Sequence, residues 1–176
     1  MKRYPIILLT LAVMQAITSC QDTGNKEIPV YEGPLRVIEN VERYQSENDR
    51  ITIKMVAPKV YEFQNGDVEF PDGVDMDFYN EFGKISSKLH ANHAYYFKEE
   101  DQWRGRGDVE VNNIEKDEQL NTEELFWKPA EERIYTKSFF TLRQQDNVIY
   151  GDGLEAKQDL SESTFLNTYG DFEVEE

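Results

Sequence analysis

The chain has 176 residues and a formal net charge of −16, with 35 acidic side chains against 19 basic ones. Its length suits one domain once a targeting segment is set aside, and so acidic a chain is a poor ligand for nucleic acid or for an anionic membrane surface. Cys20 is the only cysteine, which excludes an intrachain disulfide and a thiolate metal cluster.

The first residues form a targeting segment. Lys2 and Arg3 precede an apolar run of about 12 residues, which is shorter than the ~20 residues that cross a bilayer. The run ends in Ile17-Thr18-Ser19-Cys20, which matches the bacterial lipobox whose cysteine becomes the lipidated first residue. We therefore interpret residues 1–19 as a lipoprotein signal peptide and Cys20 as the lipidation site. The alternative is a plain secretory signal with an incidental cysteine.

Residues 20–34 are expected to be a lipidated tether, because their Gly, Pro, Asp and Asn content cannot form a core. Lipid chains on Cys20 would give durable membrane attachment, since each buried CH₂ contributes about 0.8 kcal/mol.

From residue 51 onward the sequence repeats itself. The segment Ile51–Phe63 returns as Ile85–Phe97, with shorter echoes at Leu120–Trp127 and Ile149–Leu154. A period near 30 residues is typical of an array of supersecondary units that share one core. Apolar and polar residues alternate within the repeats, so we predict an all-β fold of strand-turn-strand units.

A small residue inside each repeat predicts a bend in the strand. Ala57, Ala91, Thr122 and Gly151 each follow an apolar residue by two positions, and the next apolar position is out of phase with strict alternation. An extra residue between two in-phase sets is what a β-bulge supplies. We infer strands that turn a corner as the sheet folds over on itself. The alternative is that these are ordinary small core residues.

The order and spacing of short motifs resemble the LptC family, the periplasmic subunits of lipopolysaccharide export, over Leu35–Phe165. The matching motifs are Asn40-Val41, Ser46–Asp49, Ala57, Asp72–Val74, Leu89–Ala94, Gly107–Val109, Leu120–Leu125 and Gly151–Leu154. The resemblance implies an antiparallel β-jellyroll of V-shaped cross-section, open at both edges, without catalytic residues or a cofactor. Better-known members have an uncleaved transmembrane helix where this chain has a lipobox. The resemblance also implies a periplasmic domain that its lipid anchors to the inner membrane, with the outer membrane as the alternative.

The same resemblance implies a crease that holds lipopolysaccharide acyl chains and passes them to the bridging jellyroll protein of the ABC export system. Inward-facing positions on alternating strands are our candidates to line it: Ile53, Met55, Val74, Met76, Phe78, Leu89, Val109, Val111, Phe140 and Leu142. Aromatic residues such as Trp127 either rim this crease or serve in ordinary sheet packing.

Two exposed strands are expected to dock partners by β-augmentation. One edge would meet the periplasmic domains of the transporter, and the other would meet the bridging jellyroll protein. The N-terminal edge, about Arg36–Tyr44, includes Val37 and Val41. The C-terminal edge, about Val148–Asp159, has Gly151, Gly153 and Leu154 as its candidate contacts. We expect a jellyroll domain over 35–165 and an acidic tail over 166–176.

Two rival functions remain open at this point. One is a closed β-sandwich lipoprotein that binds carbohydrate or a surface partner, which predicts covered edges and a filled interior. The other is a glycoside hydrolase, which needs two carboxylates in one cleft, with Glu69 and Glu110 as candidates. His90 and His93 lie three residues apart, on opposite faces of a strand, and no third ligand follows at a recognisable spacing, so we expect no metal site.

Overall fold

The computed structural model describes residues 31–144 and 147–169. Within them lie eleven strands and one 3-10 helix, η1 (Pro129–Glu131), all in the unit that begins at Gly33. The strands are β1 (Arg36–Glu47), β2 (Arg50–Glu62), β3 (Val68–Phe70), β4 (Val74–Tyr79), β5 (Ile85–Ala91), β6 (His93–Phe97), β7 (Gln102–Asn113), β8 (Glu118–Lys128), β9 (Arg133–Gln144), β10 (Asn147–Lys157) and β11 (Ser163–Tyr169). The predicted all-β fold is confirmed.

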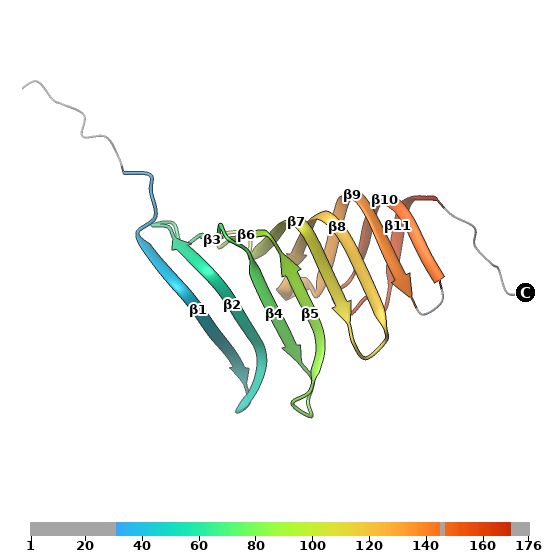
Figure 1. Ribbon diagram of the computed structural model, residues 1–176, viewed down its shortest axis with the longest axis horizontal. Coiled ribbons are helices and arrows are strands. Elements are labelled where there is room, and N and C mark those ends of the chain that lie inside the picture. The colour runs from blue at the N-terminus through green and yellow to red at the C-terminus, as the bar shows by residue number, and fades with distance from the viewer. Residues whose placement is uncertain (1–30, 145–146, 170–176) are drawn as a thin grey trace, which may run out of the picture. The chain divides into compact units, whose positions relative to one another are not determined.

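All the strands belong to one antiparallel sheet that folds over into two layers (Figure 1). The first part of β2 pairs with β4, and its last residues pair with β3. Likewise the first part of β7 pairs with β6, and its second part pairs with β5. We call the two sides the β4–β5 layer and the β3–β6 layer. Each long strand therefore contributes one half to each layer.

The strands bend where they cross between the layers, and the sequence predicts the bends near Ala57, Ala91, Thr122 and Gly151 but not the one in β7. Pairing registers slip between Arg106 and Val109 in β7, between Thr122 and Phe126 in β8, and between Asp152 and Leu154 in β10. These slips are the β-bulges that let a strand change direction without losing its partners. In the two earlier repeats the buried alanines, Ala57 and Ala91, lie at the corresponding positions of β2 and β5.

The core lies between the layers, close to the bends. It contains side chains that are at most 1% exposed, including Phe70, Val74, Val109, Leu120 and Phe140. Removing such a side chain from water contributes about 1.5–3 kcal/mol. Phe140 also stacks on Phe165 of β11, with ring centroids 5.5 Å apart. These contacts join the last strand to the shared core.

The sheet has two edges within the described residues. β1 pairs only with β2, as expected for the N-terminal edge, and β11 pairs only with β10. The predicted C-terminal edge is therefore wrong, because β10 has β9 on one side and β11 on the other. The predicted tail also begins too early: residues 166–169 belong to β11. Residues 1–30, which include Cys20, lie outside the described residues.

Candidate functional site: an apolar cavity between the layers

The space between the two layers is filled with side chains in one part and hollow in another. In the filled part a void of about 20 Å³ remains among residues such as Met76, Ala94 and Leu125. That is room for about one water molecule and too little for a lipid chain. The hollow part is a cavity of about 420 Å³. This volume falls within the ~300–1,000 Å³ that is usual for small-molecule sites.

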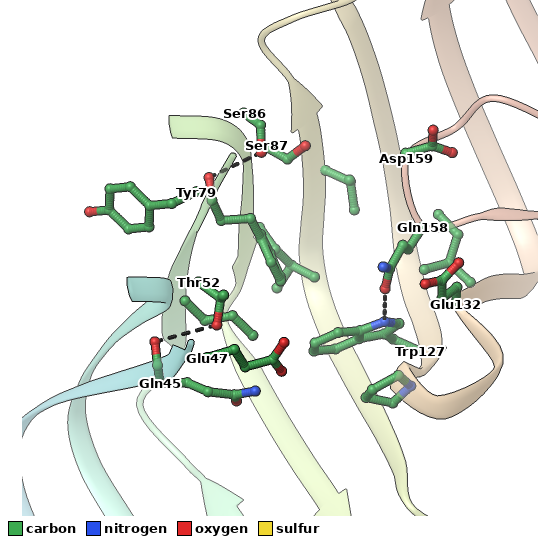
Figure 2. A pocket seen from close by; sticks show the side chains of 16 residues that line it. Gln45, Glu47, Thr52, Tyr79, Ser86, Ser87, Trp127, Glu132, Gln158 and Asp159 are labelled. Atoms are coloured by element: carbon green, nitrogen blue, oxygen red, sulfur yellow. Dashed lines mark hydrogen bonds between the residues drawn. The ribbon is translucent and has the colours of Figure 1, made fainter. Parts of the chain in front are cut away.

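The cavity has an apolar floor built from both layers (Figure 2). β2, β4 and β5 contribute Ile53, Phe78 and Leu89, and β8 contributes Trp127 from the opposite side. Phe78 and Trp127 meet edge to face, with ring centroids 5.6 Å apart. This aromatic pair joins the two layers at the base of the cavity. The remaining apolar lining is Val111, Pro129 and Ile134.

Polar side chains form the rim of the cavity, and they come from separate strands and turns. They are Gln45, Glu47, Thr52, Tyr79, Ser86, Ser87, Glu132, Gln158 and Asp159. Figure 2 shows the indole N–H of Trp127 donating to Gln158 Oε1, at 2.9 Å. An apolar floor below a polar rim suits an amphipathic ligand whose apolar part enters the cavity.

The rim is acidic. Partial burial opposes the ionisation of Asp159, but hydrogen bonds from Ser161 and Lys116 outweigh it and lower the pKa of Asp159 to about 2. Glu47 and Glu132 add two further carboxyl groups, and none of the described lining residues is Lys or Arg. The rim offers hydrogen bonds, and Lys116, which borders it, is already paired with the Asp159 carboxylate at 3.1 Å.

The ten predicted crease residues all face the interior between the layers or pack against its core. Four of them line the large cavity: Ile53, Phe78, Leu89 and Val111. The other six lie in the filled part: Met55, Val74, Met76, Val109, Phe140 and Leu142. The ten predicted residues therefore lie on one continuous inward-facing surface, and four of them are exposed to the cavity.

Of the five predicted partner-edge residues, two lie on an edge strand and three lie on a strand inside the sheet. Val37 and Val41 lie on the edge strand β1, and Val37 is 55% exposed. Gly151, Gly153 and Leu154 lie on β10, which is paired on both sides. Gly151 and Leu154 are paired with both neighbouring strands, and Gly153 is the bulged residue between them, so none of the three lies on a free edge.

Sequence reasoning missed Ile134 and Gln158 as lining residues. Ile134 follows the period of two in β9, which could have identified it as inward-facing. Gln158 lies in a turn, and its contact with Trp127 spans 31 residues of sequence. No local pattern indicates such a contact.

The two histidines face away from the cavity and bind carboxylates. His90 Nδ1 is 2.7 Å from Asp75, and this hydrogen bond raises the pKa of His90. His93 Nε2 is 2.9 Å from Glu69. Among the described residues no group of three His, Cys, Asp or Glu side chains could hold a metal ion.

The hydrolase rival needs Glu69 and Glu110 in one cleft, and they lie in different layers. Glu69 is on β3, whereas Glu110 pairs with His90 of β5 in the other layer. Each of them alternates with inward-facing neighbours such as Phe70 and Val109, so both carboxylates face outward. This placement does not provide the paired carboxylates of a glycosidase.

A folded sheet with an apolar cavity has the features of a protein that holds an apolar ligand, and in its described part β1 and β11 are each paired on one side only. The chain matches the family model described as lipopolysaccharide-assembly, LptC-related, over residues 5–169. The protein therefore belongs to the LptC-related family, and its role is in lipopolysaccharide transport at the cell envelope. No curated protein matches the chain significantly. Among the described residues no helix is long and apolar enough to cross a membrane.

Proposed function

We propose that this protein is a membrane-anchored periplasmic subunit of the lipopolysaccharide export ABC transporter. Its cavity takes up lipopolysaccharide acyl chains and passes them to the bridging jellyroll protein. The observation that carries the proposal is the apolar cavity of about 420 Å³, whose opening is rimmed by hydrogen-bonding groups. An acyl chain fits the floor, and a sugar headgroup fits the rim.

The chemistry of the cavity supports binding through apolar contact. Burial of apolar surface contributes about 25 cal/mol per Å², and Ile53, Phe78, Leu89 and Trp127 supply that surface. The acidic rim favours a ligand that leaves its phosphate groups in solvent. Binding of this kind holds the lipid without a fixed ionic contact, which suits a carrier that must release it.

The two edge strands support docking on both sides by β-augmentation. β1 and β11 each have one unpaired edge among the described residues. Backbone N–H and C=O groups on such an edge accept a further strand from another protein. We assign β1 to the periplasmic domains of the transporter and β11 to the bridging jellyroll protein.

A pair of photo-crosslinking positions tests the cavity. Ile53 and Phe78 are cross-strand partners that face it, and their neighbours Lys54 and Asp77 are cross-strand partners on the opposite face. We expect a photoreactive residue at position 53 or 78 to capture lipopolysaccharide, and the same residue at 54 or 77 to capture none. Equal capture on both faces, or capture at 54 and 77 alone, contradicts the proposal.

Attachment through lipid on Cys20 is a separate part of the proposal and has its own test. The sequence before it reads as a lipobox, and the polar segment after it reads as a tether. We expect Cys20→Ala to move the protein from the membrane fraction to the soluble periplasmic fraction. Unchanged membrane fractionation in carbonate-washed membranes would refute a lipid anchor at this cysteine.

A further inference from the structure

One turn of the β3–β6 layer reaches across to the β4–β5 layer. This turn, residues 158–162, joins β10 to β11, and we call it the strap. Asn113, at the inward-facing end of β7, donates to the backbone oxygen of Asp159 at 2.9 Å. Lys116, in the β7–β8 turn, donates to the same backbone oxygen at 2.9 Å and to the Asp159 carboxylate at 3.1 Å. The strap thus ties the rims of the two layers together.

The strap is also tied to its own layer. Trp127 donates to the Gln158 side chain at 2.9 Å, and the Gln158 backbone N–H donates to Glu132 O at 2.8 Å. Leu160 is 1% exposed and packs into the core, with a backbone φ of +59°. A leucine adopts this left-handed conformation only when its surroundings impose it, and such strained residues are frequent in switch regions.

The strap separates the cavity from the C-terminal end of the interior. Its residues Gln158 and Asp159 form part of the cavity wall. Beyond it the inward side chains of β9, β10 and β11 close on one another. Phe140 stacks on Phe165, and Ile149 packs against the buried core. A chain lying in the cavity therefore has no open path to the β11 edge while the strap is closed.

We infer that the strap is a gate that holds a lipid acyl chain in the cavity until the layers part at the C-terminal end. This inference rests on the proposed function and adds a controlled step to it. The contacts between the two layers that close the gate are hydrogen bonds from Asn113 and Lys116 and one half-exposed ion pair, which can break and re-form, while buried Leu160 anchors the strap in the core. β11 begins at Ser163, directly after the strap, so a partner strand that pairs with β11 also acts on the gate.

A crosslink across the strap tests the gate. The full-length chain with Lys116→Cys and Asp159→Cys has one engineered thiol on each side of the observed ion pair, and Cys20 is the only native cysteine. A short bis-maleimide closes this pair permanently. A photoreactive residue is placed at Ile53, within the cavity, or at Ile149, beyond the strap. The probe is purified lipopolysaccharide.

The matched control is Lys116→Cys alone, treated with the same reagent, which loses the same ion pair but has no covalent link across the strap, so that the remaining contacts can still open. We expect the control to capture lipopolysaccharide at both positions. In the crosslinked protein we expect capture at Ile53 to persist and capture at Ile149 to fall to the level of the unirradiated sample. Equal capture at Ile149 in the two proteins overturns the gate but leaves the proposed function standing. Loss of capture at Ile53 in the control overturns both.

Discussion

The missing side chain at Gly151 allows β11 to lie against β10. A Cβ atom at this position would collide with the backbone oxygen of Asn167 in β11 and would lie 2.9 Å from the Phe140 ring. Neither neighbour can move away without a cost in stability, because the first is a backbone atom and the second belongs to a fully buried ring. The sequence predicts Gly151 as a contact of the C-terminal partner edge, where the lack of a side chain would allow a close backbone approach. In the structure, bulk at Gly151 would displace β11, the strand that forms the edge.

We therefore predict that Gly151→Val lowers the free energy of unfolding by about 1–3 kcal/mol, the usual cost of overpacking. The loss should be measured by urea denaturation, and hydrogen exchange should show the amides of residues 163–169 exchanging faster than those of β9. Val148→Ala, at an exposed position of the same strand, is the control and should cost less than about 0.5 kcal/mol. A Gly151→Val protein with unchanged exchange in β11 would contradict this account.

At the scale of elements, the bent strands could be predicted and the last strand could not. The bends leave a local signal, because a small residue and a change of phase occur together at Thr122 and Gly151. β11 leaves little signal. Only Phe165 of its seven residues packs against the core, so the alternation that marks a strand is nearly absent. The sequence alone therefore predicts the C-terminal edge one strand too early, on β10.

The candidate site likewise has one part that could be predicted from the sequence and one part that could not. Its apolar floor follows from alternation within single strands, which is why Ile53, Phe78, Leu89 and Val111 could be predicted. Its wall at the strap depends on contacts between distant segments. Asn113 and Asp159 are 46 residues apart, and the turn that holds Asp159 carries no apolar pattern. Such pairings depend on how the sheet folds over, which a period of two cannot reveal.

At the scale of the whole molecule, the negative net charge disfavours the binding of an anionic lipid, whereas the apolar cavity favours it. The chain carries a net charge of −16, and the cavity rim includes the carboxylates of Glu47, Glu132 and Asp159. These charges repel phosphate groups, whereas the apolar floor attracts acyl chains. Long-range repulsion is screened by salt, but burial of apolar surface is not weakened by it.

We predict that lipopolysaccharide binds this protein more tightly as ionic strength rises. The screening length falls from about 30 Å at 0.01 M to about 8 Å at 0.15 M, so the repulsion between the acidic domain and the lipid phosphates should largely disappear over that range. The measurement is photo-capture at Ile53 across a sodium chloride series. An uncharged detergent with a single alkyl chain, competing for the same cavity, is the control and should show little change. If capture of lipopolysaccharide instead falls steeply with salt, cations of the protein hold the phosphates, and the apolar cavity is not the main source of affinity.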